Sequence, residues 1–211
     1  KNVGLPEDPA TGKRGENIYL FIVKAIAKEQ VCGWEIEINR LRRKGLNSIS
    51  LHNRMIIGYI RSLILTIIAL IIGGVSGMFF FLLLAMLSKS LLEAINYIEH
   101  YGLVRERGKP VGMRHSWNSN HCISSLYLYN VTRHSDHHRA SNLKFWELSA
   151  CDKSAPTLPY GYLGMLYLLL ITPFLFRRIM LKKLIDWDLN YANEQERKLA
   201  NVLTRKMVLL K

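Results

Sequence analysis

The chain has 211 residues and a net charge of +13 at pH 7, and hydrophobic residues make up 49% of it. The apolar residues are concentrated, because Arg61 is the only charged residue between positions 55 and 88. This composition excludes a disordered chain, a collagen-like chain and a disulfide-stapled secreted module. Cys32, Cys122 and Cys151 form no C-x-x-C pair, so the sequence predicts no thiolate metal site and is typical of a reducing compartment.

The first predicted elements lie outside the membrane. Residues 1–13 contain Pro and Gly and are expected to form a loop, and residues 17–43 show the apolar spacing of a helix. Gly33 lies within that segment, where it is expected to break the helix in two. We therefore expect residues 1–54 to form a cytosolic loop and amphipathic helices.

Residues 55–100 are predicted to contain two transmembrane helices. As a helix rising 1.5 Å per residue, the apolar run 55–72 nearly spans a hydrocarbon core of about 30 Å. An uncharged glycine-containing turn follows, and residues 78–100 form the second helix. Its late polar residues share one helical face, and they are Lys89, Glu93, Asn96 and His100. Such a face is either a solvated stripe at the helix end or a lining of a protein cavity, and ionisable groups beside a membrane favour the cavity.

Basic residues flank this predicted hairpin and are absent from its turn. They are Arg40, Arg42, Arg43, Lys44 and Arg54 before it, and Arg105, Arg107, Lys109 and Arg114 after it. The positive-inside rule therefore predicts an integral membrane protein with both chain ends in the cytosol. Because the basic residues are clustered beside the membrane rather than interleaved with aromatic residues, we expect no nucleic-acid partner.

Residues 101–211 are expected to form a cytosolic histidine-motif region. Residues 116–138 have a helical pattern, and an interfacial helix is predicted near 163–180, lying on or dipping into the inner leaflet. If that stretch crossed the membrane, its basic end would be placed outside, against the charge rule. The predicted fold class is an all-α membrane protein, with a transmembrane helical hairpin and a cytosolic helical histidine-rich region.

The histidines carry the chemical signal. If residues 133–138 are helical, His134, His137 and His138 lie on one face, and His100 lies at the mouth of the second predicted span. Imidazole binds Fe, Zn, Cu and Ni, so the four histidines predict a metal site, with a solvated basic helix end as the alternative. The short-spaced Cys/His sets of structural zinc are absent from the sequence, and histidines clustered beside a membrane favour iron and oxygen chemistry.

Several motifs together resemble those of a known family. They are NYIEHYGL at 96–103, RHSWNSNH at 114–121, RHSDHH at 133–138 and LPYGYLGM at 158–165, with PEDPA at 6–10 and LIDW at 184–187. These motifs resemble the C-terminal portion of the membrane alkane 1-monooxygenase family. That family is a branch of the integral-membrane fatty-acid desaturase and hydroxylase group.

The resemblance implies an oxidoreductase with two iron ions in a non-haem di-iron site on the cytosolic side of a helical bundle. Such a monooxygenase takes an alkane or lipid substrate from the bilayer and inserts one oxygen atom of O2 into a terminal methyl group. Rubredoxin and its reductase are the implied electron donors. No catalytic residue is expected beyond the metal ligands.

The resemblance also assigns roles to particular residues. His100, His134, His137 and His138 are implied as iron ligands. Glu99 and Asp136 are expected to orient ligand imidazoles through the other ring nitrogen. His115 and His121 share a family motif, and we expect supporting roles for them rather than metal ligation.

The sequence also departs from the family pattern. The family has two further histidine clusters, of HxxxH and HxxHH type, before the PEDPA motif, and this sequence lacks both of them. The first residue is not Met, as expected of part of a longer protein. After the last histidine motif, Arg139-Ala140-Ser141 replaces the usual Ala-His-Pro. The alternatives are a related di-iron hydroxylase or desaturase acting on fatty acyl or other lipid chains, or an inactive fragment lacking the upstream histidine clusters.

Overall fold

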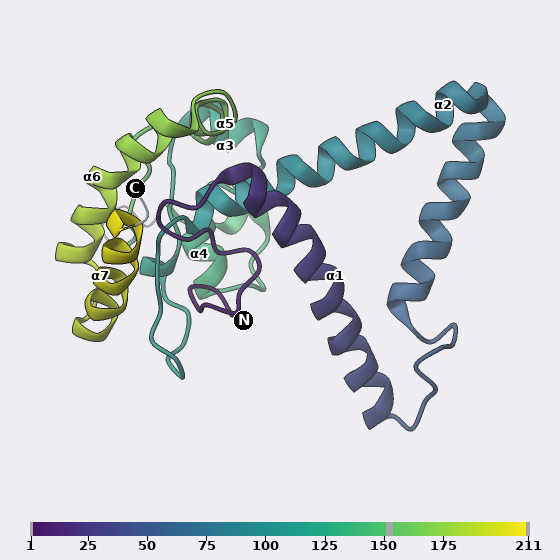
Figure 1. Ribbon diagram of the computed structural model, residues 1–211, viewed down its shortest axis with the longest axis horizontal. Coiled ribbons are helices and arrows are strands. Elements are labelled where there is room, and N and C mark those ends of the chain that lie inside the picture. Colours follow the sequence, from purple (N-terminus) through teal and green to yellow (C-terminus); the bar gives the residue numbers. More distant parts are fainter. Residues whose placement is uncertain (1, 151–153, 210–211) are drawn as a thin grey trace. The chain divides into compact units, whose positions relative to one another are not determined.

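The computed structural model describes residues 2–150 and 154–209, with side chains as far as residue 201 (Figure 1). Within these ranges the regular structure is helical and includes no strand beyond one isolated bridge between Asn118 and Thr157. The helices in chain order are α1 (Ile18–Arg43), α2 (Arg54–His100), η1 (Met113–His115), α3 (Cys122–Tyr127), α4 (His134–Arg139), η2 (Phe145–Glu147), α5 (Tyr162–Ile171), α6 (Pro173–Asn190) and α7 (Glu194–Leu209), η1 and η2 being 3-10 helices. The predicted all-α class is confirmed for the described residues.

The chain divides into two compact units. The first, which we call the histidine unit, combines the described residues of Lys1–Ile22 and Glu93–Lys211. The second, which we call the apolar unit, is Val23–Leu92. Helices α1 and α2 each begin in one unit and end in the other.

In the apolar unit, polar side chains connect the end of α1 to the start of α2. Asn53 caps α2, because its side-chain oxygen accepts hydrogen bonds from the backbone N–H groups of Met55 and Ile56. Glu37 accepts from Arg40 and from the backbone N–H of Arg54. The hydrogen bond from the Arg40 guanidinium is the main reason that the pKa of Glu37 falls to about 2. The carboxylate therefore remains ionised at neutral pH at the junction of the two helices.

Helix α2 is long, apolar and exposed. It is the one helix in the described part of the chain that is long and apolar enough to cross a membrane, and none of its most apolar window is buried. Exposed side chains along it include Leu63, Ile72 and Phe80. An apolar surface of this kind is unfavourable in water and is typical of a helix surrounded by lipid.

Helix α2 bends sharply, as Figure 1 shows, and its non-helical residue is a glycine. Gly74 has φ 62° and ψ −162°, a backbone conformation that residues with a Cβ rarely adopt. The bend brings Gly77 against the turn before it, because a Cβ on Gly77 would lie 2.9 Å from the carbonyl oxygen of Ala69. A turn is therefore present in the predicted glycine-containing segment, and within α2 it consists of one non-helical residue, Gly74.

Buried aromatic rings join α1, α2 and α6 in the histidine unit. The ring of Tyr97 lies 4.9 Å from that of Phe21 and 5.0 Å from that of Tyr101, centroid to centroid. Phe176 of α6 lies 5.4 Å from Tyr101. These rings bury large apolar areas and fix the end of α2, where His100 lies, against its neighbours.

An ion pair ties the N-terminal loop to the same core. Arg14 donates to both carboxylate oxygens of Asp188 on α6, at 2.8 and 2.6 Å, and to the carbonyl oxygen of Gly102 at 2.9 Å. The two-point contact suits the planar guanidinium group. Residues at the start of the chain thus help to hold the turn that follows His100.

Several predicted helices have different boundaries in the structure. Helix α1 is continuous through Gly33, so the expected break there was wrong. The helical segment expected over 116–138 is replaced by α3 and α4, because Tyr129 and Asn130 have left-handed φ angles of 49° and 57°. The stretch predicted as one interfacial helix is divided into α5 and α6, because Pro173 cannot continue the backbone hydrogen-bond pattern of α5.

We predict that Gly102→Ala destabilises the histidine unit. Gly102 has φ 71°, and an added Cβ would lie 2.7 Å from Leu184 and 2.9 Å from Arg14. The left-handed backbone alone costs about 1–2 kcal/mol with a Cβ present, and the contacts add to that cost. Gly108→Ala is the matched control, since Gly108 has φ 85° with nothing within 4 Å of its added Cβ. Thermal unfolding in detergent should show a larger loss for Gly102→Ala, and equal losses would contradict the prediction.

Candidate metal centre

The first candidate ligand, His100, is the last residue of α2 and is 3% exposed. Its Nδ1 lies 3.2 Å from the carbonyl oxygen of His115. Since a carbonyl oxygen only accepts hydrogen bonds, Nδ1 carries the proton and Nε2 keeps its lone pair. Fixing one ring nitrogen in this way is how proteins direct the other toward a metal ion.

Helix α4 brings two more imidazoles to Nε2 of His100. The Nε2 atoms of His134 and His138 lie 3.2 and 3.5 Å from it. Their spacing of four residues places both rings on one face of α4. One nitrogen from each of the three residues can be chosen so that all lie within 4.8 Å of one another. We call this group the histidine trio.

The two distances from His100 match the spacing of nitrogens around a metal ion, and all three nitrogens lie within 4.8 Å of one another. Two nitrogens bound to one ion at about 2.1 Å lie about 3.0–3.4 Å apart in tetrahedral or octahedral geometry. The two distances from His100 fall in or next to this interval. Neutral imidazoles suit several transition metals, iron among them, so these residues fit a histidine-bound ion.

Buried polar contacts hold α4 in this position. The hydroxyl of Ser135 donates to the carbonyl oxygen of Ser116 at 3.0 Å. Asp136, which is fully buried, accepts from Arg139 at 2.7 Å and from the backbone N–H of Ser149 at 2.8 Å. Asp136 thereby fastens α4 to the segment that follows it. Its second partner, Arg139, is one of the residues that depart from the motif expected for the family.

Glu99 adds a buried carboxylate beside the histidine trio. Its Oε2 lies 3.4 Å from Nε2 of His134, and its Oε1 has no hydrogen-bond partner among the described residues. A buried carboxylate oxygen without a partner is costly, unless a cation or a donor from elsewhere reaches it. The location of Glu99 therefore suits a residue that faces a cation.

His137 lies near the histidine trio but outside the group of three. Its ring centroid is 5.8 Å from that of His134 and 6.0 Å from that of His138. The helical spacing alone predicted that His137 lies on one face of α4 with His134 and His138. The structure brings His100 to the other two and leaves His137 at the side of the centre.

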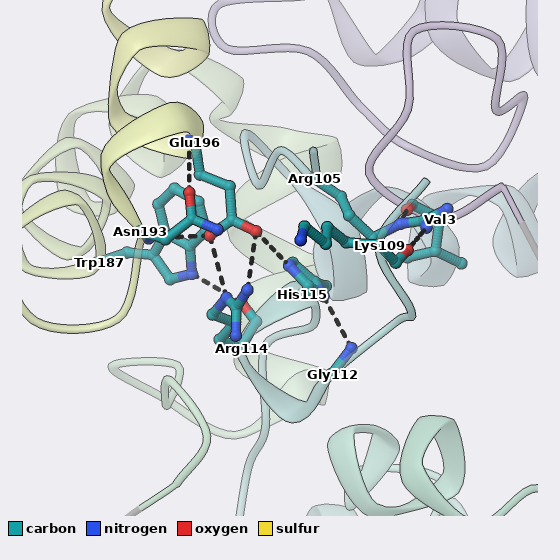
Figure 2. Close-up of polar contacts among 9 residues, drawn as sticks. All are labelled: Val3, Arg105, Lys109, Gly112, Arg114, His115, Trp187, Asn193 and Glu196. Atoms are coloured by element: carbon teal, nitrogen blue, oxygen red, sulfur yellow. Dashed lines mark hydrogen bonds and ion pairs between the residues drawn. The ribbon is translucent and has the colours of Figure 1, made fainter. Parts of the chain in front are cut away.

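His115 and His121 occupy different environments. His115 is fully buried, and its Nε2 lies 2.8 Å from a carboxylate oxygen of Glu196 (Figure 2). Its ring therefore does not face the trio, although its carbonyl oxygen orients His100. His121 is exposed and immediately precedes α3. Neither belongs to the three-histidine group.

Sequence reasoning missed Glu196. It accepts from both Arg114 and His115, and it lies on α7. Burial alone would raise the pKa of Glu196, but hydrogen bonds from His115, Arg114 and Asn193 outweigh it and lower the pKa to about 2. The Asn-x-x-Glu spacing at 193–196 predicts a helix start, but no local pattern indicates contact with the histidine motif.

A cavity of about 520 Å³ opens beside the centre, lined by Arg105, Gly108, Lys109, Pro110, Val111 and His138. Arg105 shapes its wall by donating to the carbonyl oxygen of Val3 at 2.7 Å and to that of Lys109, as Figure 2 shows. The cavity thus combines two basic residues with one member of the trio.

The known proteins that this chain resembles in sequence include several monooxygenases. Alkane 1-monooxygenase 1 of Pseudomonas aeruginosa is 38% identical over 204 residues, covering 92% of this chain and 51% of the relative. Alkane 1-monooxygenase of Ectopseudomonas oleovorans is 36% identical over 90% of this chain and 49% of its own length. The xylene/toluene monooxygenase hydroxylase component XylM of Pseudomonas putida is 34% identical over 95% of this chain and 54% of its own length.

The chain spans about half the length of these curated relatives. The profile of the fatty acid desaturase family matches residues 1–169, which include the histidine trio and Glu99. Because this match covers most of the chain, the chain belongs to the fatty acid desaturase family.

Proposed function

We propose that the chain is part of a di-iron membrane monooxygenase that hydroxylates the terminal methyl group of alkanes. The observation that carries the proposal is the convergence of His100, His134 and His138 from two separate elements. The alkane 1-monooxygenases among its relatives support the reaction type. O2 is the oxidant, and rubredoxin with its reductase is the proposed electron source.

The protein's task follows from the substrate. A terminal methyl group has no polar handle, so acid–base groups cannot activate it, and the oxidant must be formed at a metal. When bound, the two irons supply that oxidation, in which one oxygen atom enters the C–H bond and the other leaves as water, with two electrons and two protons consumed. The residues of this chain ligate the irons, orient the ligand rings and shape the approach to them.

We assign His100, His134, His137 and His138 as iron ligands. The trio would hold one ion, and His137, whose ring lies 5.8 Å from that of His134, would serve the second. Four imidazoles are too few for two irons, so the remaining ligands would come from the part of the protein that corresponds to the other half of its relatives. Glu99 contacts the trio-facing Nε2 of His134 rather than its other ring nitrogen and would face the ion. Asp136 would support the ligands by fixing α4, and His115 and His121 would support them as well.

The membrane arrangement is also proposed. Residues 55–100 would cross the bilayer as a hairpin bent at Gly74, with residues 1–54 and 101–211 on the cytosolic side. The exposed apolar surface of α2 and the basic residues that flank it support this orientation. Helices α5 and α6 would lie at the inner leaflet, where exposed Tyr167 and Phe174 suit the interface. An alkane dissolved in the bilayer would then enter between helices.

The electron donor would approach from the cytosolic side. The cavity next to His138 contains Arg105 and Lys109, and exposed Arg107 lies between them in sequence. Exposed Lys109, and Arg107 beside its ion-pair partner Glu7, would attract an acidic carrier and speed its association, while buried Arg105 holds the loop.

A second candidate function differs only in the substrate. The similarity to the XylM component of a xylene/toluene monooxygenase supports an alkyl-substituted aromatic compound as the substrate. Fatty acyl chains are a further possibility within the desaturase family. The same ligands would serve each of these, with pocket shape deciding between them.

We predict that His138→Ala in the complete protein releases the iron held by the trio, about half of the total. Loss of one of three converging nitrogens should lower octane-to-octanol turnover at least about 100-fold, since changes to residues that merely support ligands already cost 10–100-fold. Iron content and product formation measure the effect. His52→Ala is the control, because His52 is exposed and outside the trio. Unchanged iron in His138→Ala would refute the ligand assignment.

His137→Ala tests the second iron. If His137 serves a different ion from the trio, the variant should retain about half of the iron and lose hydroxylation. Mass spectrometry measures the iron content of the variant, and product formation measures its turnover. Full iron content with normal turnover would show that His137 binds no metal.

A substrate panel tests the reaction. We expect the complete protein to convert octane to 1-octanol faster than it converts p-xylene to its benzylic alcohol, measured by gas chromatography. Faster conversion of p-xylene would favour the second candidate function. An unsaturated product from a fatty acyl chain would instead identify a desaturase.

A further inference from the structure

Glu196 is a buried carboxylate of the histidine unit that has several hydrogen-bond donors around it. Its side chain is fully buried and accepts from Nε and Nη2 of Arg114, both at 3.0 Å. It also accepts from the backbone N–H of Asn193 at 2.9 Å and contacts Nε2 of His115 at 2.8 Å. Figure 2 shows these contacts converging on one carboxylate. Glu196 lies outside the residues 1–169 that match the family profile.

The contacts of His115 define which nitrogen carries its proton. The backbone N–H of Gly112 donates to Nδ1 of His115 at 2.8 Å, so Nδ1 must be unprotonated. The proton of the neutral ring is therefore on Nε2, which donates to Glu196. Both ring nitrogens are engaged, and His115 is held rigidly between η1 and α7.

The backbone of His115 continues this chain of contacts to the metal centre. Its carbonyl oxygen accepts the proton of Nδ1 of His100, whose Nε2 faces His134 and His138. Trp187 of α6 also holds η1, which contains His115, by donating to the carbonyl oxygen of Arg114 at 2.6 Å. A shift of His115 would therefore alter the hydrogen bond that aims His100.

We propose that Glu196 is a positioning residue of the metal centre, which acts through His115 to orient His100. The C-terminal helix α7 thereby becomes part of the machinery for metal binding. This inference rests on the proposed function, because it concerns the same iron site. A carboxylate two contacts away from a metal ligand influences the affinity of the site by restricting the ligand ring.

A purely structural role for Glu196 makes a different prediction. Glu196 and Asn193 form a capping box at the start of α7, since the backbone N–H of Glu196 donates to the Asn193 side chain at 2.8 Å. If capping were the whole role, removing either residue would act only through the stability of α7.

The test is an anaerobic Fe²⁺ titration of the complete protein in detergent, with the visible absorption of the Co²⁺-loaded protein as a signature of ligand geometry. Glu196→Ala should weaken Fe²⁺ binding about tenfold and change the Co²⁺ spectrum. Glu196→Gln should recover part of the affinity, because its amide oxygen still accepts from His115.

Two matched variants separate positioning from stability. Asn193→Ala removes the other half of the capping box and should lower the melting temperature while leaving Fe²⁺ affinity and the Co²⁺ spectrum unchanged. Glu194→Ala removes an exposed carboxylate from the same helix and should change neither.

The outcomes distinguish the two proposals. Wild-type affinity and spectrum in Glu196→Ala would overturn the inference and leave the proposed function standing. Equal losses of affinity in Asn193→Ala and Glu196→Ala would also overturn it, in favour of the structural role. A wild-type protein that binds no Fe²⁺ would overturn the proposed function, and the inference with it.

Discussion

The three-residue segment 115–117 determines the geometry of the candidate metal centre. Its first residue accepts from His100, and its last donates a backbone N–H to the carbonyl oxygen of Glu99 at 2.8 Å. The middle residue accepts from Ser135 on α4. Both elements that carry the trio are therefore bonded to one extended segment. Because these bonds are buried from water, they hold the imidazoles at a spacing that neither element could set alone.

Local sequence rules predicted part of the centre. His134 and His138 are four residues apart, and a single helical turn is enough to bring them together. The motif resemblance supplied His100, and the structure brings it to the other two. Nothing local could identify Glu196, because its contact with His115 joins residues 81 positions apart and depends on how α7 packs. The same limit explains His137, whose place beside the trio depends on where α2 ends.

The sequence predicted the parts of the fold that depend on composition. It predicted less well the helix boundaries that depend on single residues. The apolar character of α2 and its bend at glycine followed from the sequence, whereas the continuity of α1 through Gly33 did not, since one glycine costs a helix only about 1 kcal/mol. The N-terminal segment belongs to the histidine unit, where Arg14 pairs with Asp188, 174 positions away. Such long-range pairing leaves no periodic signal.

The shortness of α4 has a thermodynamic consequence. A helix of six residues is not stable by itself, so α4 depends on tertiary contacts such as those to Ser116 and Ser149. An ion bound across His100 and α4 would add a cross-link that exists only in the folded protein. Metal loading and local folding then form one linked equilibrium, in which the ion tightens the loop that presents it. Cellular iron supply would in this way set the lifetime of the folded centre as well as its occupancy.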